Sequence, residues 1–465
     1  MRSRTNRPDP DGRGAAPYGW SPMLVLAAVN LVDGAEKSLV AGALPLLQDE
    51  WGFSDTWGGA IPAADAAISA VVLLPAGYLA DRVTRTRLLA IVVLSWAVLS
   101  TASAAAVSFA MFFAVRFVLG AANALDNPPA SSLLADFYPS RSRGRAFGTQ
   151  RIALALGTAI GLAVGGGVGE LLGWRAPFLV MALPGLAVAL LCARLVEPPR
   201  GGLDRAHHEA GPYRPPGEET PTEATGDGPS GSGGTPLPGA AGPRGQLRLV
   251  RTLLSIPTVR SLYLGLTLTL LGLQGVVFWL PSFLERTHDL TEGRAAALTG
   301  AVFLLTSLPG SLVGGALGDR AGLGRPGGRI VVVAASVAAG AGLLIAGLVV
   351  PVLAPQLLLV AAAVFVLSFS VPNYAAATAD VIPAPVRGTG FSVFTLLVSV
   401  GGALGPLLVG LVSDLGSLRL ALVVAVLPAL VGSPVVLRAA ATHDADVASA
   451  RAAVAPTLAP RRDRG

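Results

Sequence analysis

Four polar residues stand close together in the first long apolar stretch of the chain: Asn30, Asp33, Glu36 and Lys37. At about 100° per residue they occupy an arc of about 120° on a helix. If the stretch crosses a bilayer, each charge costs about 2.5–3.5 kcal/mol at its centre, so the stripe should face a bundle interior with Asp33 and Lys37 paired. Two acids and one base leave one carboxylate without a partner on this helix. The stripe predicts either a proton or ligand site or a permanent ion pair that fixes packing.

A second polar stripe lies in the apolar stretch that begins near residue 109. Its polar members are Arg116, Asn123, Asp126 and Asn127. We expect Arg116 to pair with Glu36 or Asp33, either within a site or as a constitutive salt bridge. Pro128 and Pro129 cannot supply the N–H that a helix interior requires, so they should interrupt this helix.

Other polar residues in the apolar stretches are few. Asp65 is a lone acid, which is either a protonation site or a protonated packing residue. In the second half of the chain, the candidates for a polar wall of the same site are Gln274, Trp279, Asn373 and Tyr374. Packing between helices is an equal alternative for these four.

Aspartates and arginines also gather where apolar stretches end. A carboxylate there can pair with an arginine or cap the N-terminus of a helix, so we predict a gate rather than a ligand site. Its members are Asp81, Arg82, Arg85, Asp136, Arg143, Asp319, Arg320, Asp380 and Arg387. We expect Asp81 to meet the helix start near Arg387, and Asp319 to meet the helix start near Arg143.

No residue cluster predicts a metal, a cofactor or catalysis. Cys192 is the only cysteine, so it can form no internal disulfide, and we expect it to pack in a helix. We expect His207, His208 and His443 in disordered segments and His288 in an external loop. No GxxxxGK[ST] sequence is present, which argues against ATP as an energy source.

Composition places these residues in a membrane protein. Of 465 residues, 52% are hydrophobic and 13% are charged, whereas soluble proteins carry about 25% charged residues. A spanning helix needs about 20 apolar residues, and twelve stretches qualify. They run approximately over 22–47, 57–80, 88–106, 109–133, 146–169, 176–196, 258–283, 295–317, 329–350, 356–378, 389–412 and 417–437. The predicted fold class is an all-α membrane protein.

The twelve stretches divide into two sets of six. We expect an N-terminal tail 1–20, a first bundle 21–197, a linker 198–256, a second bundle 257–438 and a tail 439–465. The linker is rich in Gly, Pro, Thr, Ser and Glu, so it should be disordered, and the tail should be loosely ordered.

Loop charge predicts the orientation. Arginine clusters after the second, fourth and eighth stretches and in the linker, whereas the loops after the first, third and ninth contain no Arg or Lys. The positive-inside rule therefore places both termini in the cytoplasm of a multi-pass plasma-membrane protein. The net charge of +6 reflects these loops, so we expect no nucleic-acid partner.

An internal repeat relates the two sets. ADFYPSRSRGRAFG from Ala135 matches ADVIPAPVRGTGFS from Ala379 at an offset of 244, and the same offset aligns Gly161 with Gly405. A second pair, GYLADR from Gly77 and GALGDR from Gly315, is offset by 238. Parallel halves of this kind suit alternating access, in which two bundles rock about a site at the midplane.

These residues resemble the major facilitator superfamily. Gly77, Asp81, Arg82 and Arg85 resemble its signature between helices 2 and 3, with Thr84 in place of the usual Gly. The resemblance implies twelve transmembrane helices in two pseudo-symmetric six-helix bundles. Arg116 with Gly120 resembles its helix 4 motif. The Gly157, Gly161 and Gly165 ladder resembles the helix 5 motif of its antiporters without the characteristic Pro.

Within the superfamily the chain resembles the Spinster-like branch. The resemblance in the first helices rests on Asn30, Glu36, Lys37, Ala41, Gly42, Gln48, Asp55 and Gly59, and near helices 10 and 11 on Asn373, Asp380, Arg387, Ser413 and Asp414. Two departures affect the site. Glu36-Lys37 replaces the family's Asp-Arg pair, and Asn123 replaces its helix 4 acid.

The resemblance implies a secondary transporter of a small amphipathic or lipid-like molecule. We expect proton coupling through Glu36, Asp33 and Asp126, with Glu36 at the position of the family's helix 1 acid. We expect the protein to act as a monomer in the lipid bilayer. The alternatives are a facilitative uniporter, a drug or metabolite exporter of another branch, and a membrane sensor that does not transport.

Overall fold

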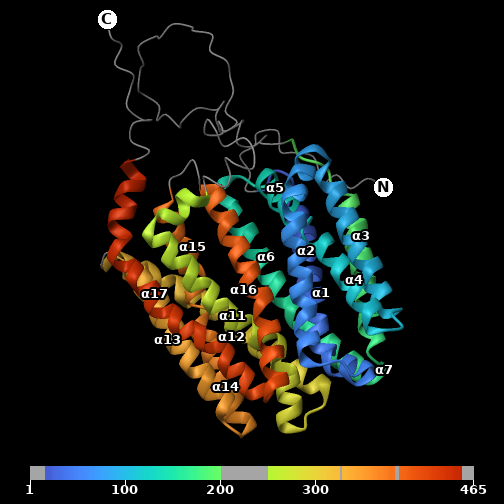
Figure 1. The fold of residues 1–465 in the computed structure, drawn as a ribbon. Coiled ribbons are helices and arrows are strands. Elements are labelled where there is room, and N and C mark those ends of the chain that lie inside the picture. The colour runs from blue at the N-terminus through green and yellow to red at the C-terminus, as the bar shows by residue number, and fades with distance from the viewer. Residues whose placement is uncertain (1–15, 200–249, 325–326, 383–386, 453–465) are drawn as a thin grey trace, which may run out of the picture.

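The computed structural model describes residues 16–199, 250–324, 327–382 and 387–452, and within these ranges the regular elements are helices (Figure 1). The first half contains α1 (Ser21–Trp51), α2 (Asp55–Arg82), α3 (Arg85–Ala104), α4 (Phe109–Asn123), α5 (Asn127–Phe137), α6 (Ser140–Ala163), η2 (Val164–Val168), α7 (Gly169–Leu172) and α8 (Arg175–Ala193). The second half contains α11 (Pro257–His288), α12 (Glu292–Gly324), α13 (Gly328–Val349), α14 (Leu353–Leu367), α15 (Ser370–Val381), α16 (Arg387–Leu415) and α17 (Leu418–Ala452).

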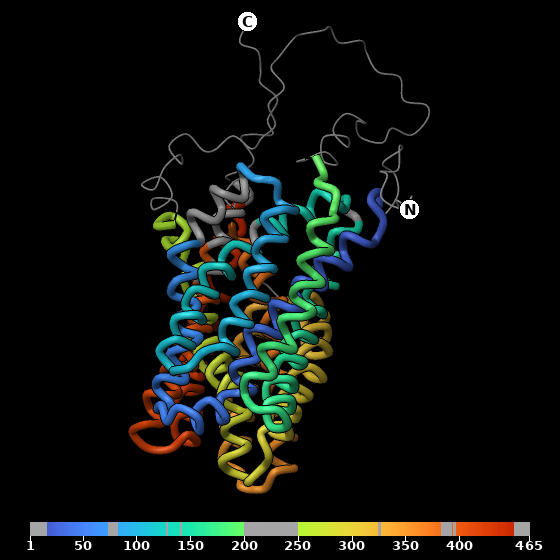
Figure 2. The backbone as a smooth tube through the Cα atoms, turned by 90° about the vertical axis from the view of Figure 1, so that its right-hand side faces the viewer, coloured from blue at the N-terminus to red at the C-terminus, as the bar shows by residue number. Residues whose placement is uncertain are grey.

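When α4 is counted with α5, α6 with η2 and α7, and α14 with α15, these elements make twelve helical segments. The segments run between two faces of the molecule (Figures 1 and 2). In the described part of the chain, nine helical segments are long and apolar enough to cross a membrane. We call the face that holds the starts of α1, α3 and α11 the arginine-rich face. The opposite face holds the start of α2 and the end of α11. The expected all-α class with two six-helix groups is confirmed.

Two of these helical segments are broken at equivalent points of the repeat. α4 ends at Asn123 and α5 begins at Asn127, with proline in its first turn, as expected from Pro128 and Pro129. In the second half α14 ends at Leu367 and α15 begins at Ser370, two residues before Pro372. A proline is tolerated in a first turn because the N–H there has no partner within the helix.

Glycines allow α6 and the following η2 to approach α1 closely. A Cβ atom at Gly157, Gly161 or Gly165 would lie 2.1–2.4 Å from backbone oxygens of α1, so no side chain fits. The repeat-related Gly405 of α16 is as tightly placed, because a Cβ there would lie 2.2 Å from the Leu271 oxygen of α11. Small residues of this kind permit close packing where lipid provides no hydrophobic driving force.

The two halves pack on each other along α2 with α16 and along α6 with α12. A Cβ at Gly59 would lie 2.2 Å from the Pro406 oxygen, and one at Gly410 would lie 2.2 Å from the Asp55 oxygen. These close contacts lie in the part of α2 near the opposite face.

The chain around the second bundle is more helical than we predicted. The tail after Arg438 is not loose, because α17 continues to Ala452 and includes His443. Asp446 accepts a hydrogen bond of 3.0 Å from the Thr258 N–H at the start of α11, where the helix dipole favours an acid. His288 is the last residue of α11 rather than part of a loop.

The expected linker is only partly described. Residues 250–255 of it are helical, and Leu253 is buried in the core. His207 and His208, together with residues 200–249, lie outside the described residues.

Candidate functional site

The polar stripe of α1 carries an open ion pair between Lys37 and Asp33. The Lys37 Nζ lies 2.6 Å from a carboxylate oxygen of Asp33, one helical turn away, as predicted. The Lys37 side chain is 46% exposed, whereas Asp33 is buried at 9% exposed. The negative charges of Asp126 and Asp65 also act on Lys37. This group is therefore one base facing several acids.

Glu36 points to a different, closed environment. Its carboxylate lies 2.7 Å from Arg116 Nη1 of α4 and accepts a 3.2 Å hydrogen bond from Ser100 of α3. Both charged side chains are about 95% buried. The Arg116 guanidinium also lies 4.8 Å from the ring centre of Phe178, a cation–π contact. Of the two partners that the sequence left open for Arg116, the structure selects Glu36.

Asp65 of α2 is held by the second stripe. Asn123 of α4 donates a 2.9 Å hydrogen bond to its carboxylate. The helices meet closely there, since a Cβ at Gly120 would lie 2.4 Å from the Asp65 backbone oxygen. Asp65 thus lies beside the α4 stripe rather than alone. The Asn127 side chain lies outside the described residues, and Asp126 ends the break before α5.

Asn30 connects α1 to α6 rather than to the ion pairs. Its amide donates to the Gln150 side chain at 3.2 Å and to the Leu26 backbone oxygen at 3.1 Å. These bonds hold the arginine-rich end of the α1–α6 contact.

Three of the four second-half candidates are packing residues in this conformation. Trp279 is fully buried and donates from Nε1 to the Pro406 oxygen at 2.9 Å. Asn373 is buried and donates to the Gly314 oxygen of α12 at 2.8 Å. Tyr374 is fully buried, whereas Gln274 is exposed. Interhelical packing, the alternative that the sequence left open, therefore describes Trp279, Asn373 and Tyr374.

Part of the predicted gate forms a buried network at the arginine-rich face. Arg85 pairs with Asp136 and Glu197, and it donates 2.7 Å and 2.9 Å hydrogen bonds to the Ser132 hydroxyl and the Pro198 oxygen. Burial alone would raise the pKa of Glu197, but hydrogen bonds from Arg85 and Thr86 outweigh it and hold the pKa below its usual value.

The second half has a more open arginine cluster at the same face. Arg329 lies 2.7 Å from Asp319 and 3.2 Å from Asp380. Asp319 therefore pairs within its own half and not with the helix start near Arg143, which donates to the Ala135 and Tyr138 oxygens. Arg82 and Arg320 are exposed. The side chains of Asp81 and Arg387, and so their expected contact, lie outside the described residues.

A clamp between the halves closes the opposite face, and the sequence did not predict it. Arg286 of α11 binds Asp55 of α2 through two hydrogen bonds of 2.8 Å and also binds Gln48. Ser413 donates to Asp55 at 2.6 Å, and Asp414 accepts from the Asp55 N–H at 3.0 Å.

Comparison with known proteins gives this arrangement a family. Residues 26–371 and 293–464 match the profile of the Major Facilitator Superfamily. The gallate transporter of Pseudomonas putida is 28% identical over 412 residues, covering 87% of this chain and 88% of that protein. Human protein spinster homolog 1 is 29% identical over 221 residues, 45% of this chain and 41% of that protein.

The chain belongs to the major facilitator superfamily.

Solved structures agree on the fold. A bacterial homologue of the human lysosomal transporter Spinster, in an inward-facing and unoccupied conformation, has a TM-score of 0.73 and 22% identity, covering 93% of this chain and 99% of that one. The D-xylose–proton symporter has a TM-score of 0.61 and 15% identity, covering 88% and 96%. The predicted family and the likeness to Spinster-like proteins are confirmed.

The clamp and the arginine clusters take their meaning from this family. Transporters of the superfamily work by moving two halves against each other around small-molecule substrates. The clamp joins the halves at the opposite face, while the Arg85 and Arg329 clusters each lie within one half. Four residues of the clamp were noted in the sequence only as points of resemblance: Gln48, Asp55, Ser413 and Asp414. Arg286 was missed, because a single arginine just after the predicted span 258–283 resembles a topology signal.

Proposed function

We propose that this transporter couples the movement of a small amphipathic or lipid-like molecule to protons by alternating access. The observation that supports this proposal is the contrast between the two ion pairs of α1, Lys37 with Asp33 and Glu36 with Arg116. The Lys37 side chain is half exposed and the charges of Asp126 and Asp65 also act on it, so we expect protons to reach this pair more readily than the enclosed pair of Glu36 and Arg116. Intramembrane acids in such places are the usual carriers of coupling protons.

This geometry shifts the proposed proton carrier from Glu36 to Asp33. Glu36 is enclosed by Arg116, Ser100 and the Phe178 ring, which fits a structural ion pair. Asp33 pairs with Lys37, on which the negative charges of Asp126 and Asp65 also act. We further propose that the arginine-rich face is cytoplasmic and that the protein acts as a monomer in the plasma membrane.

The test is proton-driven accumulation in proteoliposomes that contain the purified full chain. Ligands are first chosen by thermal shift from gallate, L-galactonate and single-chain phospholipids. With an imposed pH gradient, wild type should accumulate the ligand, and Asp33→Asn should only equilibrate it. Asp49→Asn, at the exposed end of the same helix, is the matched control and should accumulate normally.

Other outcomes assign the function differently. If Glu36→Gln loses accumulation while Asp33→Asn keeps it, Glu36 is the carrier, as its position in the family suggests. Equilibration by wild type without proton movement indicates a uniporter. Ligand binding without any flux indicates a sensor.

A second candidate is transport of a small organic acid. It is favoured by the similarity to the gallate transporter over most of the chain and by the half-exposed side chain of Lys37, a cation that could bind a carboxylate. Stabilisation by gallate, but not by single-chain phospholipids, would select this candidate. Its loss in Lys37→Gln would place the carboxylate at that ammonium.

A further inference from the structure

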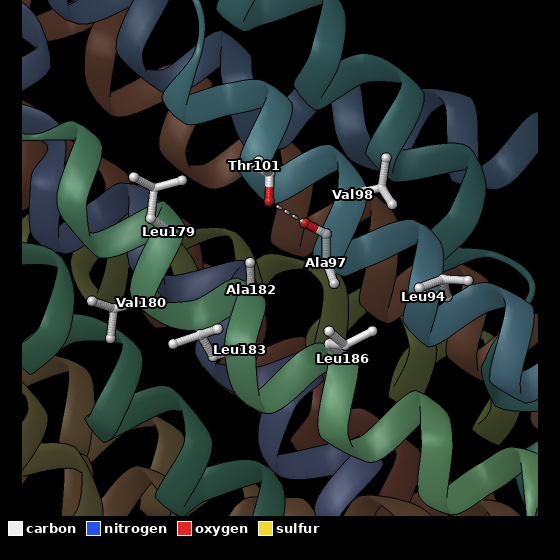
Figure 3. Close-up of a pocket in the computed structure, with 9 residues that line it drawn as sticks. All are labelled: Leu94, Ala97, Val98, Thr101, Leu179, Val180, Ala182, Leu183 and Leu186. Atoms are coloured by element: carbon white, nitrogen blue, oxygen red, sulfur yellow. Dashed lines mark hydrogen bonds between the residues drawn. The ribbon is translucent and has the colours of Figure 1, made fainter.

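An apolar groove runs along the outer surface of the first half, between α3 and α8 (Figure 3). Its wider part has a volume of about 500 Å³. Leu94 and Val98 of α3 form one wall, Leu179 and Leu183 of α8 form the other, and the small Ala182 lies between them. The Thr101 hydroxyl in the groove already donates a hydrogen bond of 2.9 Å to the Ala97 backbone oxygen, so its proton is not available to a polar ligand.

The groove faces away from the second half. α3 packs on α8, α4 and α5, and α8 packs on α3 and α1, all within the first bundle. Its walls are large apolar side chains that other parts of the protein leave open, with Val98 58% and Leu183 70% exposed. In a membrane protein such a surface meets acyl chains.

A narrower part, about 140 Å³, extends the groove to the arginine-rich face along Ile91, Leu190 and Ala193. Two arginines stand at that end. Arg87 precedes Ile91 by one helical turn and so shares its side of α3, and Arg194 directly follows Ala193. Both side chains are exposed, and in the part of the chain that the structure describes neither has a hydrogen bond or an ion pair.

We propose that this groove binds one anionic phospholipid, with an acyl chain between α3 and α8 and its phosphate at Arg87 and Arg194. Lining and charge agree with this occupant. The residues that line the groove are apolar apart from Thr101, and two exposed arginines stand in the chain at its arginine-rich end. Basic positions between transmembrane helices bind anionic headgroups in this way.

A second copy of the chain fits the groove less well. Its two free arginines would then require acidic partners at the arginine-rich end of the other copy. Ordinary bilayer lipid also differs from the proposal, because it would show no preference between anionic and zwitterionic headgroups.

The experiment measures lipid binding to the purified full chain by native mass spectrometry. Phosphatidylglycerol and phosphatidylcholine with the same acyl chains are the two probes. We expect wild type to retain phosphatidylglycerol preferentially. Arg87→Gln and Arg194→Gln should each weaken phosphatidylglycerol binding about fivefold and leave phosphatidylcholine binding unchanged.

Arg260→Gln is the matched control, since Arg260 is also exposed at the arginine-rich face but lies at the start of α11. It should keep wild-type binding. Ala182→Leu fills the groove without changing charge and should weaken the binding of both lipids. Equal binding of the two lipids by wild type, an equal effect of Arg260→Gln, or dimers that lipid does not displace would overturn the proposal. The arginine variants keep the test valid if Ala182→Leu does not fold.

Discussion

The same arginine–aspartate pairing stands in both halves of the chain, but its surroundings differ. Arg329 lies 244 residues after Arg85, and Asp380 lies 244 residues after Asp136, which is the offset of the internal repeat. In the first half Arg85 is 2% exposed, Asp136 is 10% exposed, and Glu197 and Pro198 complete the site. In the second half Arg329 is 22% exposed, and its partners Asp380 and Asp319 are 46% and 73% exposed.

The difference indicates which pair can break during transport. A buried ion pair is costly to break because removing one partner leaves an uncompensated charge away from water. An exposed pair exchanges its partner for water at little cost. We therefore interpret the Arg85 cluster as a rigid fastening of the first bundle and the Arg329 cluster as a releasable contact.

The largest effect should follow removal of the buried arginine. Arg85→Gln removes a buried cation that pairs with both Asp136 and Glu197, so it should lower the free energy of unfolding by about 3–5 kcal/mol. Thermal unfolding of the detergent-solubilised protein measures this. Arg87→Gln, two residues away and unpaired, is the control and should melt like wild type. A stable Arg85→Gln protein would remove the basis for the comparison.

The clamp at the opposite face should give an intermediate effect. Arg286→Gln removes the bonds to Asp55 and Gln48, and exposure of Arg286 limits the loss to about 1.5 kcal/mol. The opposite face should then open about tenfold more often.

Labelling of an introduced cysteine reads out this opening. The natural Cys192 is fully buried, so Leu44→Cys, also buried near Trp279, is the intended maleimide target. Its labelling should accelerate in Arg286→Gln and not in Arg294→Gln, an exposed arginine of the same face. Unchanged labelling in both variants would mean that the clamp does not hold the halves closed.

The partly buried Arg329 of the second half should matter least to stability. Arg329→Gln should change the free energy of unfolding by about 1 kcal/mol or less, because water replaces its partners. The same thermal measurement tests it, with Arg320→Gln as the control. A loss as large as that of Arg85→Gln would show that the two halves are equivalent after all.

A small pH effect should distinguish the buried cluster further. The folded-state pKa of Glu197 lies below its ordinary value of 4.5, so its stabilisation is fully present above pH 4.5 and is lost as pH falls through the folded-state pKa. Between pH 7 and pH 4, wild type should therefore lose slightly more melting temperature than Glu197→Gln. Parallel curves would indicate that Glu197 contributes little to the cluster.

The sequence predicted the repetitive part of this protein well. Apolar length and the repeated Asp136 and Asp380 segments predicted two sets of six spans, and the Asp33–Lys37 pair followed from helical spacing. The prolines after Asp126 predicted the break between α4 and α5. These features depend on residues that are near in the chain or on a pattern that occurs twice.

Only the tertiary structure decided which distant charges meet. Arg116 could have faced Asp33 or Glu36, and helix rotation and the Phe178 ring of α8 brought it to Glu36. Arg286 reaches Asp55 across 231 residues because the two halves close at one face. Arg329 corresponds to Arg85 at the repeat offset of 244 and not at the offset of 238 that relates the preceding GYLADR and GALGDR segments. Burial then makes the Arg85–Asp136 pair rigid, whereas the Arg329–Asp319 pair is more open. The physical reason is that periodicity fixes the side of a helix, whereas partner and burial depend on how whole helices pack.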